Sequence, residues 1–220
     1  MIDLHTHTTL SDGAVLPAEL VRRAEISGYK AIALTDHVDS GNIETILRQL
    51  VKLANDLNRV GGIKVLPGVE ITHMPPVLIP DLAKQARMLG AKIVVVHGES
   101  PVEPVCPGTN LSALQSDIDI LAHPGMISEE EVKLAQERGI HLELTTRKGH
   151  CLTNGRLVVL ARKYQAKMVI NTDAHKPDEL LSEDLIRKAG LGSGLTEEEL
   201  KEVLQNSVKL VEKTFRSPSK

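Results

Sequence analysis

Seven short apolar runs, separated by amphipathic stretches, constrain the fold of this 220-residue chain more than any other feature. The runs are rich in Val, Ile and Leu and are bounded by Gly, Pro, Asp or Asn, which is typical of buried β-strands. The predicted strands are Ile2–His5, Ala31–Thr35, Lys64–Val69, Lys92–Val96, Ile118–Ala122, Ile140–Leu144 and Lys167–Asn171.

The stretches between the strands have helical patterning with recognisable starts and stops. Ser128 and Glu131 form a capping-box pattern, and Gly139 ends the same helix. The predicted helices are Pro17–Ser27, Asn42–Arg59, Pro80–Leu89, 128–139, Asn154–Tyr164, Pro177–Ala189 and one or two helices within Thr196–Lys213. Strict alternation of strand and helix favours parallel strands joined by crossover helices.

The repeat length favours a closed or nearly closed α/β barrel, (βα)7, over an open doubly wound sheet. Each strand–helix unit averages about thirty residues, as barrels of this kind require. No linker or low-complexity tract interrupts the pattern, so residues 1–220 are predicted to form a single barrel domain. Its C-terminal helices are expected at about 195–214, and Arg216–Lys220 are expected to fray.

Charge and aromatic content argue against stable nucleic-acid binding. The formal net charge is −3, so the chain lacks the basic patch that duplex binding requires. The aromatic residues are Tyr29, Tyr164 and Phe215, which leaves few rings on which bases of a single strand could stack.

Neither a membrane-spanning segment nor a secretion signal is predicted from this sequence. No apolar run approaches the ~18–20 residues needed to cross a bilayer. The first residues do not pair a basic region with an apolar stretch, so a cytoplasmic protein is expected. Cys106 and Cys151 are predicted to be free thiols in structural positions, because two cysteines in a chain of this length form no disulfide framework.

Histidines and acids gather where the predicted strands end. His5 and His7 lie two residues apart and therefore point the same way on an extended strand, and Asp173 and His175 repeat this spacing at the last strand. In a closed barrel the first and last strands are neighbours, and active sites form at the C-terminal ends of the strands. Imidazole and carboxylate together suit Zn²⁺, Mn²⁺ or Fe²⁺, so a metal or catalytic cluster is predicted at this rim. The residues that share this position are His5, His7, Asp12, His37, Glu70, His97, His123, Asp173 and His175.

Three histidines lie outside the pattern. His141 falls within a strand and is predicted to be structural, and His73 lies in a Pro-rich loop and is predicted to be solvated. His150 belongs to the one basic cluster on the same rim, with Arg147 and Lys148.

Five segments of the chain resemble the motifs of the PHP (polymerase and histidinol phosphatase) family. The first is Asp3–Gly13, with the sequence DLHTHTTLSDG. The others, in chain order, are Thr35–His37, Pro67–Glu70, Ile120–Pro124 and Thr172–His175. The resemblance extends from residue 2 to about residue 180, and it implies a distorted seven-stranded βα barrel with a trinuclear metal centre.

The resemblance also implies a set of ligands for two or three divalent ions (Zn, Mn or Fe) per chain. His5, His7, Glu70 and Asp173 resemble the ligands of a first metal. Glu70 would bridge to a second metal, which His97 and His123 hold. Asp12, His37 and His175 resemble the ligands of a third.

A phosphate ester is the substrate class that fits such a centre. Three dications carry +6 and the carboxylates of Asp12, Glu70 and Asp173 carry −3, which leaves roughly +3 to attract a phosphate dianion. Metal chemistry then predicts in-line attack by a hydroxide that bridges the first two metals, so Glu70 and Asp173 would serve catalysis as well as binding.

A further set of predictions concerns contacts with the substrate. Arg147 would hold a phosphate oxygen and His150 would protonate the leaving alkoxide, although a solvated loop is the alternative for this segment, and the role of Lys148 stays open. Further candidate polar contacts are Asn154, Glu99 and Ser100, and Asp36 and Asp3 are candidates for orienting the ligands.

The leading functional prediction is a phosphomonoesterase that hydrolyses a small phosphorylated metabolite, as histidinol phosphatase-like members do. The alternative is a phosphodiesterase or nuclease that acts on nucleotides or short nucleic acid. A C–N hydrolase is disfavoured because no lysine ends the fourth predicted strand, and a non-catalytic role is disfavoured by the intact ligand set. The substrate, the metal used in the cell and the oligomeric state stay open.

Overall fold

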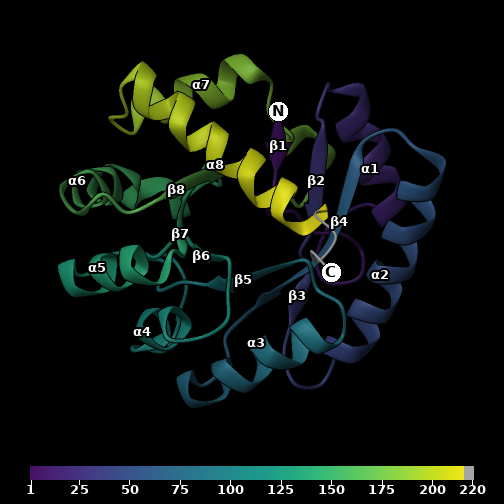
Figure 1. Cartoon of the computed structure of the whole chain (residues 1–220), viewed down its shortest axis with the longest axis horizontal. Helices are drawn as coiled ribbons and strands as arrows, with labels where there is room; N and C mark the ends of the chain where they lie inside the picture. The colour runs from purple at the N-terminus through teal and green to yellow at the C-terminus, as the bar shows by residue number, and fades with distance from the viewer. Residues whose placement is uncertain (216–220) are drawn as a thin grey trace, which may run out of the picture.

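Parallel strands form a nearly closed barrel with helices around it (Figure 1). This computed structural model describes residues 1–215, so the predicted fraying of Arg216–Lys220 lies outside the described residues. Around the barrel the strands follow the order β1, β2, β4, β5, β6, β7, β8, and each neighbouring pair in this order that forms a ladder is parallel. Their bounds are β1 Ile2–Asp3, β2 Ala31–Leu34, β3 His37–Val38, β4 Lys64–Ile71, β5 Ile93–His97, β6 Ile120–Ala122, β7 His141–Thr145 and β8 Met168–Asn171.

The short strand β3 was not predicted. It pairs with β4 in the same register as β2 does, since Leu34 lies opposite Pro67 and His37 lies opposite Glu70. The strands β2 and β3 are therefore two parts of one interrupted strand, and the barrel has the seven strand positions that the sequence predicts.

The first and last strands close the barrel through a few contacts instead of a full ladder. An isolated parallel bridge joins Thr6 to Ala174, and the His7 amide donates to the Ala174 carbonyl at 2.8 Å. Two residues before Thr6, the Leu4 amide donates to Oδ1 of Asn171 at 3.0 Å. This closure brings the two predicted pairs, His5 with His7 and Asp173 with His175, to the same side of the barrel.

The helices cover the outside of the barrel and agree with the predicted segments at most positions. Their bounds are α1 Pro17–Ile26, α2 Ile43–Val60, α3 Ile79–Met88, α4 Thr109–Leu114, α5 Glu129–Arg138, α6 Asn154–Tyr164, α7 Glu183–Gly192 and α8 Glu197–Phe215. The capping box of Ser128 and Glu131 is confirmed at the start of α5. The short helix α4 was not predicted, and the predicted helix Pro177–Ala189 is instead a 3₁₀ turn, Pro177–Glu179, followed by α7.

Two apolar layers follow from the alternation of side chains along the strands. Residues such as Val94, Val96, Leu142 and Ile170 face outward and pack against the helices. The alternate residues face inward and form a smaller cluster with two residues of α8: Leu4, Ala31, Ala33, Leu66, Ile93, Val95, Ile120, Ala122, Val169, Leu210 and Val211.

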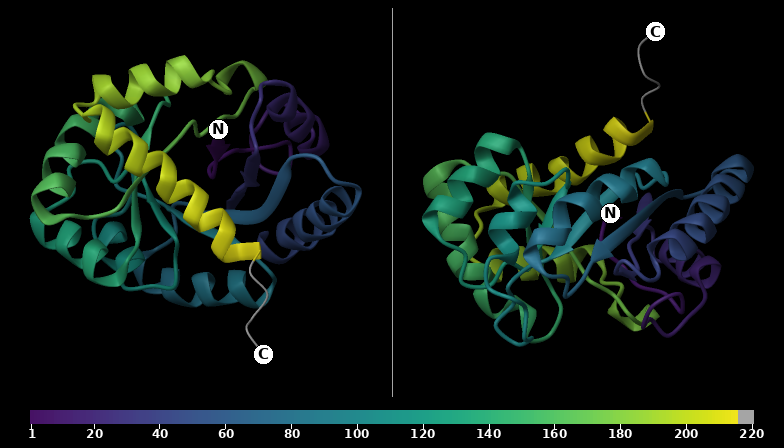
Figure 2. Two further views of the ribbon diagram at one scale, coloured as in Figure 1. Left: turned by 45° about the horizontal axis from the view of Figure 1, so that its top comes forward. Right: turned by 90° about the horizontal axis from the view of Figure 1, so that it is seen from below.

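Helix α8 runs across one end of the barrel, where the strands begin (Figures 1 and 2). The opposite end, where the strands finish, is left for polar side chains. No helix among residues 1–215 is both long enough and apolar enough to cross a bilayer.

Candidate metal centre

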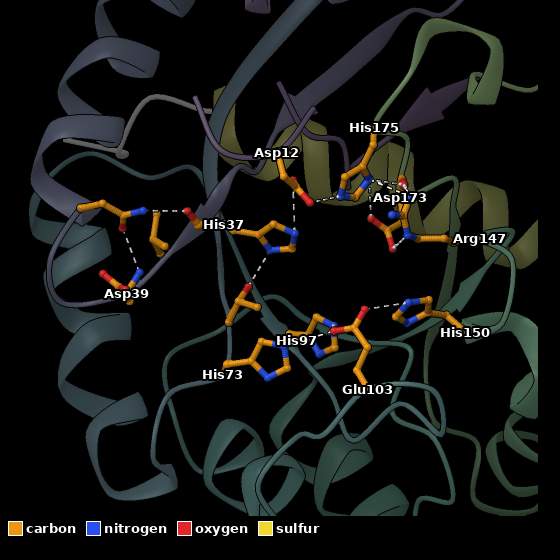
Figure 3. A pocket seen from close by; sticks show the side chains of 13 residues that line it. Asp12, His37, Asp39, His73, His97, Glu103, Arg147, His150, Asp173 and His175 are labelled. Carbon is orange, nitrogen blue, oxygen red and sulfur yellow. Dashed lines mark hydrogen bonds and ion pairs between the residues drawn. The ribbon is translucent and has the colours of Figure 1, made fainter. Parts of the chain in front are cut away.

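A cavity of about 410 Å³ opens at the C-terminal ends of the strands. Polar and titratable side chains line most of it (Figure 3). The lining residues that carry a carboxylate, an imidazole or a guanidinium are Asp12, His37, Asp39, His73, His97, Glu103, Arg147, His150, Asp173 and His175. The remaining predicted ligands, His5, His7, Glu70 and His123, lie beneath its floor and are almost completely buried.

The innermost group joins the first and last strands to β4. Nε2 of His5 lies 3.3 Å from Oε2 of Glu70 and 3.7 Å from Oδ1 of Asp173. Nε2 of His7 lies 3.6 Å and 3.1 Å from the same two oxygens. Two imidazole nitrogens and two carboxylate oxygens therefore surround one point, as the motif spacing predicts.

Glu143 of β7 fixes the orientation of His5. Its Oε1 lies 2.8 Å from Nδ1 of His5, which leaves Nε2 to face the centre. The same oxygen accepts a hydrogen bond from Asn171 at 2.7 Å. A carboxylate on the far nitrogen of an imidazole is the arrangement that sets the tautomer of metal-binding histidines. Sequence reasoning missed Glu143, although an acid between Leu142 and Leu144 in a buried strand was a usable signal.

A second group lies on the side of β2 and β3. Asp12 places Oδ1 at 3.5 Å from Nε2 of His37 and Oδ2 at 3.1 Å from Nε2 of His175. Nδ1 of His37 lies 2.8 Å from Oε2 of Glu70, so this group adjoins the innermost one. The ligand atoms of His7, Asp12, His37 and His175 all lie within 4.8 Å of one another.

A third group contains His97, His123 and His150, whose ligand atoms also lie within 4.8 Å of one another. Nε2 of His123 is 3.6 Å from Oε1 of Glu70. The structure thus brings together all nine predicted ligands, and it adds His150 to the neighbourhood of His97 and His123.

Many polar atoms of these groups are buried without a hydrogen bond from the described residues. They are Nε2 of His5, both ring nitrogens of His7 and of His123, both carboxylate oxygens of Glu70, and Oδ1 of Asp173. A buried polar atom without a partner costs on the order of 1–3 kcal/mol, so isolated examples are rare in native proteins. A set of them that converges on shared points fits bound cations, because metal ions take such lone pairs as ligands.

Burial and the pairing of carboxylates with imidazoles shift the pKa values at the site, and neighbouring carboxylates outweigh burial to raise the pKa of His5, His37 and His97. Burial alone would raise the pKa of Glu70, but the imidazoles of His5 and His37 hold it well below its usual value. The pKa of Asp173 is likewise lowered, since His5 and His7 outweigh the effect of burial. Burial lowers the pKa of His7 to about 3 and that of His150 to about 4. At neutral pH the carboxylates are therefore ionised and these two rings are neutral, which is the form that binds metals.

Arg147 lies on the wall of the cavity beside Asp173 and His175. Its NH1 is 2.8 Å from Nδ1 of His175 and donates to the backbone carbonyl of Asp173 at 3.2 Å. Its Nε lies 3.5 Å from Oδ2 of Asp173, and the side chain is 29% exposed. The guanidinium is therefore held in place at the cavity edge and still reaches solvent.

Asp36 and Asp3 orient the loops that carry the ligands. The Asp36 carboxylate accepts hydrogen bonds from the amides and hydroxyls of Thr8 and Ser11, at 2.7–3.1 Å, and so shapes the loop that presents Asp12. Asp3 accepts from the Thr172 hydroxyl at 2.6 Å, and burial raises its pKa to about 6.

Other candidate contacts lie away from the cavity wall. Asn154 is buried and bonds the Thr145 carbonyl at 2.8 Å. Glu99 accepts from the amides of Gly108 and Asn110, which fastens its own loop. Ser100 is buried, and Lys148 lines a neighbouring pocket with Arg147.

His73 and Glu103 are the rim residues whose position sequence reasoning did not anticipate. The His73 side chain is 44% exposed, as a solvated histidine should be, yet its Nε2 lies 3.1 Å from Oε2 of Glu103. Glu103 belongs to a loop with no helical or strand pattern, so nothing in its spacing pointed to the cavity.

Several residues at the cavity have strained backbone conformations. Outside glycine, residues 1–215 hold four positive φ angles, and three of them belong to His73, His123 and Asp173, at 54°, 27° and 55°. Such conformations are costly for L-residues and persist where the surrounding structure enforces them, which is common at functional sites.

Two curated proteins have sequences similar to most of this chain. A protein of Methanocaldococcus jannaschii described as uncharacterized is 47% identical over 204 residues, which cover 92% of this chain and 94% of its own. The DNA polymerase/3′-5′ exonuclease PolX of Bacillus subtilis is 26% identical over 192 residues, and the match covers 79% of this chain but only 34% of PolX.

Solved structures share the fold at low sequence identity. A chain of an archaeal ribonuclease P, solved with mature tRNA, aligns with a TM-score of 0.75 at 16% identity and covers 100% of this chain and 95% of its own. Histidinol phosphate phosphatase of Lactococcus lactis, solved with zinc, L-histidinol and phosphate, aligns with a TM-score of 0.59 at 14% identity, over 98% and 94% of the two chains.

The sequence profile of the PHP domain matches residues 3–172, a range that begins at Asp3 and includes the first seven predicted ligands. The match covers more than half of the chain, and its motifs meet at one rim of a barrel. The chain therefore belongs to the PHP domain family.

Proposed function

We propose that this protein is a metal-dependent phosphomonoesterase that acts on a small phosphorylated metabolite. The observation that carries the proposal is the convergence of nine imidazole and carboxylate side chains, several with unpartnered buried atoms, at the floor of one cavity. His5, His7, Glu70 and Asp173 would hold a first divalent ion, His97 and His123 with Glu70 a second, and Asp12, His37 and His175 a third. Divalent ions bound there would lower the pKa of water and neutralise charge on a phosphoryl group.

Arg147 would bind the phosphate from the side of the cavity. Its guanidinium is positioned by His175 and by the Asp173 carbonyl, so little side-chain entropy remains to be lost when a phosphate oxygen binds. Because Arg147 is partly exposed at the cavity edge, it can reach a ligand that enters from solvent. We expect this contact to contribute to substrate affinity more than to turnover.

The cavity favours a compact, polar substrate. Its volume of about 410 Å³ is near the lower end of the range for small-molecule sites. None of its lining residues is Phe, Tyr or Trp, so it offers no ring for stacking a base. The predicted cytoplasmic location and the absence of a stable nucleic-acid partner remain predictions.

A phosphodiesterase or nuclease is the second candidate, and the relatives favour it. PolX, which matches 79% of this chain, is described as a 3′-5′ exonuclease, and a 5′-3′ exoribonuclease of Escherichia coli is 30% identical over 97 residues. Both matches cover about a third of those proteins, 34% and 32%. The metal cluster itself suits either ester class.

Release of product from paired substrates tests the proposal. The protein loaded with Mn²⁺ or Zn²⁺ should release p-nitrophenol from p-nitrophenyl phosphate and leave the bis ester intact. A panel of phosphorylated metabolites, read by release of inorganic phosphate, would then identify the substrate. Hydrolysis of the bis ester or of dinucleotides, with none of the monoester, would establish the phosphodiesterase instead.

A further inference from the structure

Glu103 occupies an unusual place, since its carboxylate lies among three imidazoles at the mouth of the cavity (Figure 3). Its Oε2 is 3.1 Å from Nε2 of His97 and 3.1 Å from Nε2 of His73. Its Oε1 is 3.2 Å from Nε2 of His150. No motif of the family resemblance includes Glu103, His73 or His150.

The imidazoles of His97, His123 and His150 converge on the side of the cavity that Glu103 covers. These three residues are at most 4% exposed. Nδ1 of His97 lies 2.9 Å from the Gly98 carbonyl, so Nε2 is the nitrogen left to bind a ligand. Both ring nitrogens of His123, and Nδ1 of His150, are buried without a hydrogen bond from the described residues.

The loop that carries Glu103 is fixed against the neighbouring strand end. The Glu99 carboxylate accepts from the amides of Gly108 at 2.9 Å and Asn110 at 3.0 Å, which ties the two ends of the loop together. A Cβ atom on Gly125 would collide with the Glu99 carbonyl, so glycine permits the close approach of the two segments. The position of Glu103 is therefore built into the fold.

We propose that His150 and Glu103 are ligands of the second metal ion, together with His97 and His123, and that Glu103 is the ligand that phosphate displaces. With Glu70, which also reaches this group, three imidazoles and two carboxylates form a donor set that suits Zn²⁺ and other borderline divalent ions. Glu70 reaches the same group from below, whereas Glu103 approaches from the solvent side, where its side chain is 35% exposed. An incoming phosphate dianion would enter by that side and would take the place of the Glu103 carboxylate.

This proposal depends on the metal centre of the proposed function, and metal binding can be measured without any activity. The variants Glu103→Gln and His150→Gln, with Asp39→Asn as the matched control, would be titrated with Mn²⁺ or Zn²⁺ against a chromophoric chelator. Asp39 lines the same cavity, but its Oδ1 accepts from the Gly41 amide and lies away from the imidazoles. Bound metal after gel filtration would be counted by mass spectrometry, and circular dichroism would verify folding.

We expect the dissociation constant of one ion to rise about tenfold or more in Glu103→Gln, and His150→Gln to lose about one ion per chain, while Asp39→Asn matches the wild type. If the wild type binds two or three ions and neither variant changes stoichiometry or affinity, His150 and Glu103 are not ligands and only this inference fails. If the wild type binds no ions at all, the proposed function fails with it.

Phosphate binding tests the displacement itself. With saturating metal, calorimetric titration with inorganic phosphate should give about tenfold tighter binding to Glu103→Gln than to the wild type, because no resident carboxylate competes. Asp39→Asn removes a negative charge from the same cavity without vacating a ligand position. Equal tightening in both variants would show a general charge effect and would overturn the displacement, as would no tightening in Glu103→Gln.

Discussion

The two ends of the barrel interior are built by the same strands and have opposite chemistry. On β5, Ile93 and Val95 belong to the apolar layer closed by α8, and His97, two residues further on, reaches the cavity. On β4, Leu66 lies in the same apolar layer while Glu70 lies at the metal-binding floor. Because alternate residues share a face, one strand aims both kinds of side chain inward, and position along the strand decides which end each serves.

Histidine shows the difference most directly. Of the nine histidines, His141 lies at the end covered by α8, and the other eight lie at the rim. At the rim the imidazoles alternate with carboxylates such as Glu70 and Asp173. His141 shares its pocket with Asp119, Lys167 and Lys213, and burial, reinforced by Lys167 and only partly opposed by Asp119, lowers its pKa to about 4. A buried histidine therefore indicates a metal site where several imidazole and carboxylate ligand atoms converge, as they do at the rim and not around His141 among the described residues.

The largest effect is expected from a substitution at the cavity floor that leaves the apolar end of the barrel intact. Glu70→Gln should lower kcat/KM for a phosphomonoester by about a thousandfold or more, because an amide cannot bridge two cations. Metal content per chain should fall with it, whereas the far-ultraviolet circular dichroism should not change. A variant that keeps its full metal content and activity would show that the carboxylate at the centre is not a ligand.

The next largest effect is expected from a substitution at the apolar end that leaves the cavity side chains unchanged. Leu210 of α8 is 6% exposed in the inner apolar layer, so Leu210→Ala should lower the free energy of unfolding by about 2–5 kcal/mol. Urea denaturation of the metal-free protein measures this change, and Leu111→Ala, at an exposed position on α4, provides the control. Metal content should equal that of the wild type. Loss of metal in Leu210→Ala would mean that the two ends are coupled.

A smaller effect is expected in the pH dependence of unfolding, to which His141 contributes from the end of the barrel that α8 covers. The pKa of His141 is about 4 in the folded protein against an ordinary value of 6.5, so below pH 6.5 the unfolded chain binds a proton that the folded chain does not. Stability from this group is therefore complete above pH 6.5 and falls toward pH 4, by at most ~1.4 kcal/mol per pH unit. His141→Gln should have a shallower pH dependence of unfolding than the wild type between pH 6.5 and 4, with chelator present. Identical slopes would contradict the buried, neutral state of His141.

The seven strand positions, and the rim at which the nine candidate ligands lie, could be predicted from sequence because each signal was local. An apolar run followed by His or Asp gives both a strand and the place where it ends, as at His97 and His123. The break between β2 and β3 could not be predicted, because it depends on Asp36 binding the distant loop of Thr8 and Ser11. The helix α4 has only six residues, too few for a periodic pattern to appear.

The polar neighbours of the ligands were harder to predict, because their positions depend on contacts between residues that no sequence pattern connects. Glu103 reaches three imidazoles because the Glu99 carboxylate holds its loop closed by accepting from the amides of Gly108 and Asn110. Glu143 meets His5 across a sequence separation of 138 residues. The sequence marks Glu143 as an acid in a buried strand, but it does not show which residue Glu143 or Glu103 contacts, since both contacts arise from loop paths and from closure of the barrel.

That closure has a consequence for how the protein is made. The bridge from Thr6 to Ala174 and the contact of His5 with Asp173 join segments that the ribosome produces near the beginning and near the end of this domain. A nascent chain that stops short of Asp173 lacks one carboxylate of the innermost group, so that group is incomplete. The groups that contain Asp173 or His175 are therefore completed only when the chain has been made through residue 175, so the order of synthesis sets which part of the centre forms last.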